Sequence, residues 1–98
     1  MSGNGTDTQE RRVKVINKLG IHARPSAMLV QLANQYESEL FVCRQGEEDD
    51  EVNAKSIMGV MMLAAGEGTV LRFRACGPDA GEVLNAVESL VKSKFNED

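Results

Sequence analysis

The chain has 98 residues and a net charge of −4, and it is 42% hydrophobic and 27% charged. A chain of this length forms one hydrophobic core, and its composition is ordinary for a globular protein. The acidic balance argues against nucleic acid as the main partner, because proteins that bind phosphate backbones usually carry a basic face. No apolar run reaches the ~20 residues of a membrane span or forms a signal-peptide core, so we expect a cytoplasmic protein without membrane insertion.

The first half of the chain predicts two strands and one helix. Residues 1–10 are rich in small polar residues, which is typical of a disordered tail, and residues 11–96 are expected to form a single domain. Residues 11–17 alternate apolar and polar side chains, which predicts a first strand. Apolar side chains then recur at helical spacing over residues 23–36, and residues 39–44 predict a second strand.

The middle of the chain begins with an acidic run. Residues 47–51 indicate a solvated hairpin tip, and a short third strand is expected at residues 51–53. Ser56 is a good N-cap for a short helix over residues 57–64. Two glycines then separate this helix from a strongly β-patterned segment, so residues 69–76 predict the fourth strand.

The last element is expected to be a helix that begins with a capping box formed by Asp79 and Glu82. Its buried stripe would consist of Val83, Val87, Leu90 and Val91. The order β-α-β-β-α-β-α is a split β-α-β arrangement, in which a right-handed crossover leaves a slot for the fourth strand between the first two. The expected fold class is therefore α+β: an open-faced sandwich with a four-stranded antiparallel sheet, order 1-4-2-3, covered on one face by three helices.

The segment Gly20-Ile21-His22-Ala23-Arg24-Pro25-Ser26 places the chain's only histidine beside an arginine at the expected start of the first helix. Pro25 favours the first helical turn. Ser26 could donate a hydrogen bond near the site, but we expect it on the helix surface. Helix starts present unpaired N–H groups and positive partial charge, which attract anions. Imidazole titrates near neutral pH and guanidinium binds phosphate with a planar fork. The combination indicates a histidine that carries a phosphoryl group.

This segment resembles the active-site signature of HPr, the histidine-containing phosphocarrier of the bacterial phosphoenolpyruvate-dependent phosphotransferase system. Residues 53–63 resemble the regulatory-serine helix of that family, and residues 77–80 lie where the family begins its last helix. The resemblance covers about residues 11–95, and three motifs in the same order make it specific. It implies the same open-faced sandwich that the pattern predicts.

The resemblance also implies roles for individual residues. His22 would be phosphorylated on Nδ1, receiving the group from enzyme I and passing it to enzyme IIA domains, and Arg24 would steer and stabilise the group. Ser56 matches a serine that an HPr kinase/phosphorylase modifies in some bacteria, which would make transcriptional regulators further partners. The protein would be a phosphoryl-transfer intermediate with no cofactor, no metal and no small-molecule reaction of its own.

The family contacts its partners through an exposed patch beside the histidine. The matching residues here are Ala23, Ala27, Ile57, Met58 and Met61. Val60, Leu63 and Ala64 are assigned to the core face of the second helix, and Met62 is also expected in the core, where methionines usually pack.

Other interpretations of these residues stay open. Ser56 could serve only as an N-cap, which is worth about 1 kcal/mol. A purely regulatory protein would bind a kinase or transcription factor according to phosphorylation, although the intact His22–Arg24 pair argues against a role confined to Ser56. An unrelated α+β binding domain would leave the three motif matches unexplained.

A metal-dependent enzyme is excluded, because the spacing of Cys43 and Cys76 fits neither a zinc site nor a redox pair. Both cysteines are expected to be reduced. The branch of the family is left open. The long acidic segment at residues 47–51 resembles the nitrogen-related phosphocarriers, whereas residues 55–59 resemble the sugar-system members.

Overall fold

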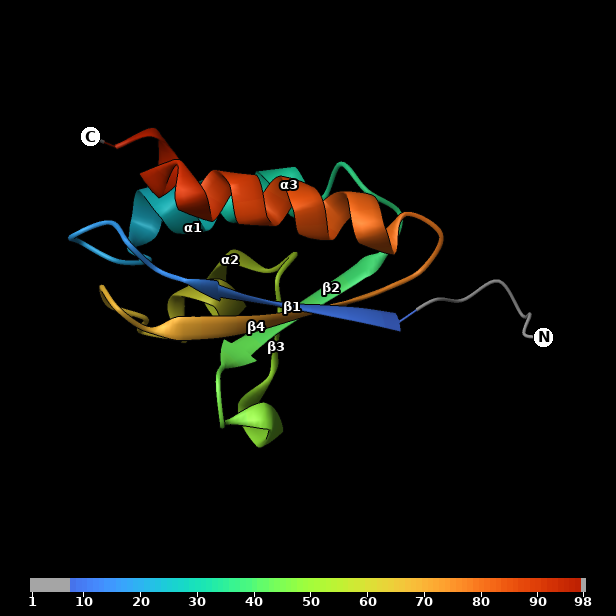
Figure 1. Ribbon diagram of the computed structural model, residues 1–98, viewed down its shortest axis with the longest axis horizontal. Helices are drawn as coiled ribbons and strands as arrows, with labels where there is room; N and C mark the ends of the chain where they lie inside the picture. The colour runs from blue at the N-terminus through green and yellow to red at the C-terminus, as the bar shows by residue number, and fades with distance from the viewer. Residues whose placement is uncertain (1–7, 98) are drawn as a thin grey trace.

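The computed structural model describes residues 8–97 and contains one four-stranded sheet (Figure 1). Its strands are β1 (Thr8–Lys14), β2 (Glu39–Arg44), β3 (Val52–Asn53) and β4 (Val70–Cys76). The order in the sheet is β1-β4-β2-β3, and β4 is antiparallel to both of its neighbours. The predicted topology is confirmed, including the insertion of the fourth strand between the first two.

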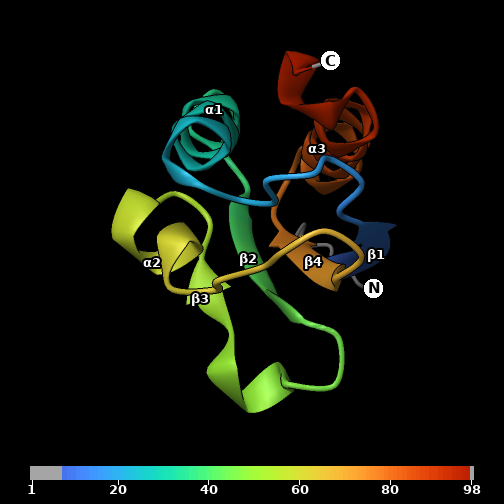
Figure 2. The same ribbon diagram turned by 90° about the vertical axis from the view of Figure 1, so that its left-hand side faces the viewer.

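Three α-helices cover one face of this sheet: α1 (Ala23–Ala33), α2 (Ile57–Met61) and α3 (Ala80–Lys92). Figure 2 shows α1 and α3 side by side above the sheet, with α2 beside the edge strand β3. Two short 3-10 turns, η1 (Glu48–Asp50) and η2 (Lys94–Asn96), complete the fold. Within residues 8–97, no helix has the length and apolar character needed to cross a membrane.

The core lies between the sheet and the helices. Alternate residues of β4 face the helices, because successive side chains of a strand point to opposite sides of the sheet. These are Leu71, Phe73 and Ala75, all fully buried. They belong to the same apolar cluster as Leu29 and Ala33 of α1 and Val83, Leu84, Val87 and Val91 of α3. This packing fixes the start of α1 above one end of the sheet.

Several element boundaries differ from the prediction. Strand β1 begins at Thr8, because residues 8–10 pair with β4, so the tail ends at least three residues earlier than expected. The disorder expected for residues 1–7 lies outside the described residues. Helix α1 ends at Ala33, three residues before the expected end, and the Asn34 side chain donates back to the Val30 carbonyl at 2.8 Å.

The predicted capping box at the start of α3 is wrong. Asp79 makes no side-chain hydrogen bond to its own helix. Its carboxylate instead accepts from the backbone N–H groups of Glu37 and Ser38 at 3.0 and 2.8 Å, and its own N–H donates to Ser38 Oγ. The Ser38 side chain is the chief cause of a lowered pKa of the Asp79 carboxyl, and the backbone hydrogen bonds from Ser38 and Glu37 lower this pKa further. Asp79 therefore ties the start of α3 to the turn before β2.

The acidic hairpin is only partly the solvated tip that its charge predicts. Glu48, Asp49 and Asp50 are exposed, but the Glu51 side chain is only 18% exposed and lies against the open face of the sheet. Its carboxylate accepts from Arg72 Nη2 at 3.0 Å and from Arg74 Nε and Nη2 at 2.9 and 2.7 Å. The bond from Arg74 is the main cause of a lowered Glu51 pKa. The hairpin is therefore held to the sheet by its last acidic residue.

Candidate functional site

His22 is the N-cap residue of α1, and its backbone is extended there, with φ of −95° and ψ of −164°. Its carbonyl accepts from Ser26 N at 2.9 Å, which closes the first helical turn. The N–H groups of Ala23 and Arg24 precede the helical hydrogen-bond ladder, and Pro25 has no N–H group to satisfy. The histidine thus stands at a helix start whose free backbone donors favour an anion.

A tight turn before the helix presents His22. Gly20 has φ of +69°, and a Cβ atom there would lie 2.4 Å from the Ala65 carbonyl oxygen, so the position requires glycine. Ile21 N donates to that same carbonyl at 2.8 Å. The turn is closed from inside by buried Asn17, whose Nδ2 donates to the Gly20 carbonyl at 2.8 Å.

The imidazole of His22 is 37% exposed, and its two nitrogens have different surroundings. Nε2 lies 2.9 Å from Glu97 Oε2. No residue within the described range hydrogen-bonds Nδ1. One ring nitrogen is therefore engaged, and the other is open to an incoming group.

Arg24 lies beside this ring, as the sequence pattern predicted. Its side chain is 56% exposed, and Nη1 contacts Glu97 Oε2 at 3.6 Å and the Phe95 carbonyl at 3.4 Å. His22 and Arg24 are thus brought together through a shared carboxylate. Apart from Nη1, its guanidinium nitrogens make no hydrogen bond to residues 8–97, and a guanidinium binds an anion with several donors in one plane.

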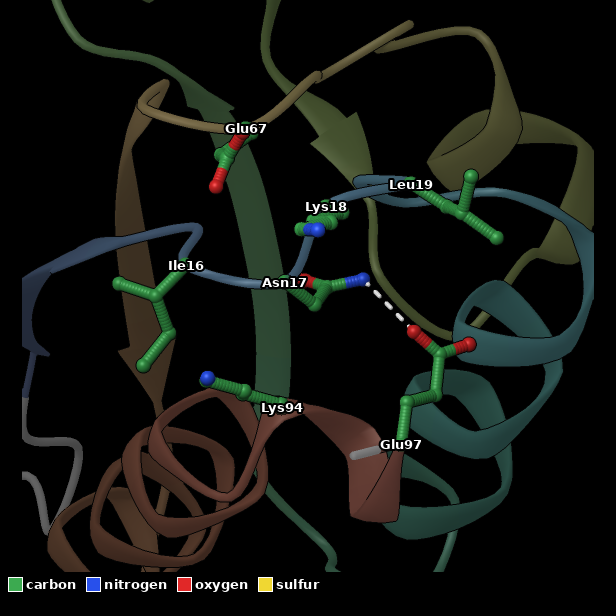
Figure 3. Close-up of a pocket in the computed structure, with 7 residues that line it drawn as sticks. All are labelled: Ile16, Asn17, Lys18, Leu19, Glu67, Lys94 and Glu97. Carbon is green, nitrogen blue, oxygen red and sulfur yellow. Dashed lines mark hydrogen bonds between the residues drawn. The ribbon is translucent and has the colours of Figure 1, made fainter.

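Glu97 is the site residue that sequence reasoning missed. It follows η2, in which Phe95 is fully buried and anchors the turn in the core. Figure 3 shows Glu97 with Asn17 and Lys94 among the residues that line a surface pocket of about 580 Å³ beside the site. The one available signal was an apolar residue, Phe95, just after the last helix. That signal indicates an anchored chain end without saying what the end contacts.

Ser26 is not on the surface, contrary to the expectation. It is fully buried, and its Oγ has no hydrogen-bond partner within the described residues. The physical reason is the orientation of α1, which turns Pro25, Ser26, Leu29 and Ala33 toward the core. The hydroxyl lies one helical turn beyond His22 but makes no hydrogen bond to the ring.

The predicted N-cap at Ser56 is confirmed. Its Oγ accepts from Gly59 N at 3.2 Å, and α2 begins at the next residue. The serine is exposed, and α2 packs against α1. The regulatory hydroxyl and the phosphoryl-accepting histidine implied by the resemblance therefore sit on neighbouring helices.

The proposed partner patch is exposed at its centre. Ile57, Met58 and Met61 are 42%, 73% and 46% exposed, while Ala23 is exposed and Ala27 half-buried. Val60 and Leu63 are buried as expected. The core assignments of Met62 and Ala64 are wrong: Met62 is 77% exposed, and Ala64 is exposed in a left-handed turn with φ of +50°. The helix ends at Met61, so the helical spacing behind the Ala64 assignment does not continue, and the usual burial of methionine does not hold for Met62 just past the last helical residue.

Cys43 is buried, Cys76 is half-buried, and both are free thiols. Within residues 8–97, no group of three or more His, Cys, Asp or Glu side chains is arranged to hold a metal ion.

Comparisons with known proteins agree with the fold and indicate the family. Residues 9–93 match the family model described as the PTS HPr component phosphorylation site. The chain is 47% identical over 89 residues to the phosphocarrier protein HPr of Xylella fastidiosa strain Temecula1, covering 91% of this chain and 97% of the relative. The crystal structure of HPr-C-His from Thermoanaerobacter tengcongensis superposes with a TM-score of 0.84 at 40% identity, over 92% of this chain and 98% of that one. The solution structure of Crh, the Bacillus subtilis catabolite repression HPr, gives a TM-score of 0.63 at 41% identity, over 85% and 95%.

Proposed function

Because the chain belongs to the HPr family of phosphocarriers of the phosphotransferase system, we propose that His22 is the residue that carries the phosphoryl group. It accepts the group on Nδ1 from enzyme I in the cytoplasm and passes it to enzyme IIA domains. The observation that supports this most is the asymmetry of the ring at the start of α1: Nε2 lies 2.9 Å from Glu97 Oε2, and Nδ1 has no hydrogen-bond partner within residues 8–97.

The surroundings of Nδ1 suit a group that must be taken up and released. The N–H groups of Ala23 and Arg24 supply neutral donors, and the guanidinium of Arg24 supplies one mobile positive charge. Such a site holds a dianionic phosphoryl group only moderately. A carrier needs this balance, because a group bound too tightly would not be passed on.

The transfer is a substitution at phosphorus. The Nδ1 lone pair forms a bond to phosphorus while the bond from phosphorus to the donor atom of enzyme I breaks, and the electron pair leaves with the donor. The second transfer reverses these roles at an enzyme IIA domain. Arg24 and the helix start stabilise the charge that spreads over the phosphoryl oxygens during each step.

We assign docking of the partners to the patch of Ile57, Met58 and Met61 on α2, with Ala23 and Ala27 on α1. Three exposed apolar side chains lie close together on one short helix, and the flexible side chains of the two methionines can repack against different surfaces. Because α2 packs against α1, a partner seated on this patch reaches His22.

The direct test is phosphorylation by enzyme I and phosphoenolpyruvate. The wild-type chain should gain one acid-labile, base-stable phosphate, and His22→Ala should gain none. Arg24→Ala should keep its melting temperature and accept phosphate more slowly, because it loses the clamp without losing the helix. Ser56→Ala should still gain the acid-labile phosphate, which separates labelling at His22 from labelling at the exposed serine. Stoichiometric labelling of His22→Ala would exclude the assignment, and a wild-type rate for Arg24→Ala would remove the role of Arg24.

A second, regulatory function is supported by the exposed Ser56 and by the similarity to Crh. In this proposal an HPr kinase/phosphorylase modifies Ser56, and transcriptional regulators read the modified surface. A phosphate at the start of α2 meets a favourable helix end, but it adds negative charge beside the docking patch.

The Ser56→Asp variant adds part of the negative charge that a phosphate on Ser56 would place beside the docking patch. Aspartate is itself a good N-cap, so the melting temperature should stay within a few degrees of wild type while transfer from enzyme I slows. Ser56→Asn, an uncharged N-cap, is the matched control. Equal transfer rates for the two variants would leave Ser56 as a cap alone.

A further inference from the structure

The turn that follows α3 has an unusual backbone. Lys94, Phe95 and Asn96 have φ values of 58°, 55° and 60°, so three successive residues other than glycine are left-handed. Side chains disfavour this region, and residues held in it tend to occur at functional sites. Full burial of Phe95 in the core holds the turn in place. The result is that the chain doubles back and brings Glu97 over the start of α1.

Both carboxylate oxygens of Glu97 are used at this position. Oε2 lies 2.9 Å from His22 Nε2 and 3.6 Å from Arg24 Nη1. Oε1 accepts from Asn17 Nδ2 at 3.1 Å, as Figure 3 shows, and Asn17 is only 2% exposed. A buried amide thus orients one oxygen of the carboxylate, and the other oxygen is aimed at the ring.

We propose that Glu97 is a positioning residue for phosphoryl transfer, which keeps the His22 ring proton on Nε2 and so leaves the lone pair on Nδ1. The proposal rests on the proposed role of His22. A carboxylate only accepts hydrogen bonds, so the nitrogen that faces Glu97 must carry the proton. A neutral imidazole has one N–H group, and Nδ1 is therefore the nucleophile. Catalytic triads use a carboxylate on an imidazole in the same way.

The contact also matters for the charge of the product. When the Nδ1 lone pair bonds to phosphorus, the proton stays on Nε2 and the ring gains a positive charge that faces Glu97. The carboxylate thus stabilises the phosphorylated ring. Arg24 contacts the same oxygen at a longer distance and is more exposed, so it can turn toward the phosphoryl oxygens while the bond from Nε2 to Glu97 persists.

Two variants of the full-length chain separate the hydrogen-bond acceptor of Glu97 from its negative charge. Glu97→Ala removes both the acceptor and the charge, whereas Glu97→Gln keeps an oxygen acceptor and removes only the charge. The matched control is Glu67→Gln, which neutralises a carboxylate that lines the same pocket. The ring tautomer of each protein is read from the ¹⁵N chemical shifts of His22 at a pH where the ring is neutral. The rate of phosphoryl acceptance from enzyme I is measured in parallel.

We expect the Nε2–H tautomer in the wild type, in Glu97→Gln and in the Glu67→Gln control. In Glu97→Ala the ring should shift toward the tautomer mixture of a histidine side chain without a partner, with a larger Nδ1–H fraction than in the wild type. Acceptance by Glu97→Ala should slow by about tenfold to a hundredfold, the effect of losing one charge-assisted hydrogen bond. Glu97→Gln should lie between it and the wild type, and the control should match the wild type.

The outcomes distinguish this inference from the proposed function. If the wild type accepts no phosphate, the role of His22 fails. If the wild type accepts phosphate and Glu97→Ala matches it in both tautomer and rate, Glu97 has no positioning role. A slowed Glu97→Ala with an unchanged tautomer would also overturn the proposal, because a merely structural loss leaves the ring proton where it was.

Discussion

Replacing Glu51 with glutamine should destabilise the domain far more than an ordinary surface change. Its carboxylate accepts three hydrogen bonds from Arg72 and Arg74, and the Arg72 side chain is only 9% exposed. Glutamine cannot neutralise the two guanidinium groups, although Glu10 still pairs with Arg72 at 2.8 Å. Hydrogen bonds to charged groups contribute about 1.5–3 kcal/mol, and breaking one side of a buried ion pair costs about 3–5 kcal/mol. Since Glu10 remains, we expect a loss of about 3 kcal/mol at pH 7.

The pH dependence gives a sharper test than the magnitude. Because the Glu51 pKa is lowered below its ordinary value of 4.5, its contribution is fully present above that value and is lost as the pH falls through the folded-state pKa. The difference in unfolding free energy between wild type and Glu51→Gln should therefore be constant from pH 6 to 7 and should narrow in acid. Urea unfolding at several pH values measures this difference directly.

The control is Asp49→Asn, which removes a charge from an exposed residue of the same hairpin. This change should shift stability by less than about 0.5 kcal/mol. A difference of that size for Glu51→Gln, or a larger difference that did not narrow below pH 4.5, would refute the view that Glu51 holds the hairpin to the sheet. At about 4–8 °C per kcal/mol, the expected loss should lower the melting temperature by roughly 10–25 °C.

Two further predictions concern the buried Ser26 and the exposed methionines of the docking patch. Ser26→Ala should raise the unfolding free energy or leave it unchanged, because it removes a buried hydroxyl without a partner among the described residues. A loss of more than about 1 kcal/mol in urea would show that the hydroxyl is satisfied. Met58→Ala and Met61→Ala should melt near the wild type but accept phosphate less efficiently from limiting enzyme I, whereas buried Leu63→Ala should lose about 2–5 kcal/mol of stability. If Met58→Ala and Met61→Ala unfold as readily as Leu63→Ala, these methionines belong to the core and the assigned docking surface is wrong.

Local patterns determined most of the fold. Residues 39–44 form the predicted strand with the predicted bounds, because a run of four apolar residues with a charged residue at each end is a property of neighbours in the chain. The strand order followed from the sequence of elements and the handedness of one crossover. His22 and Arg24 could be paired from the sequence because they lie in one short segment at a helix start, so no distant packing is needed to bring them together.

Local patterns did not predict where short elements end or how a helix is oriented against the core. Helix α2 has only five residues, so helical spacing fixes no face beyond Met61, and the core prediction for Ala64 is wrong. The core prediction for Met62 depends on the usual burial of methionine, and this preference does not say where one particular side chain lies. Ser26 was placed on the surface because a single polar residue carries no information about how α1 rotates against the core. Strand β1 extends to Thr8 because β4 is long enough to pair with it, a fact that residues 8–10 do not themselves encode.

The sequence by itself determined the chemistry available at the site: one imidazole, one guanidinium and the free donors of a helix start. Only the tertiary structure decided which ring nitrogen is open, because Glu97 is 75 residues away from His22 in the chain. The same holds for Glu51, whose carboxylate meets arginines 21 and 23 residues further along. The sequence shows that a carboxylate is present but not which groups it contacts. Burial of Phe95 fixes the backbone at Glu97, and pairing of the strands fixes the backbone at Glu51, so each carboxylate has defined partners.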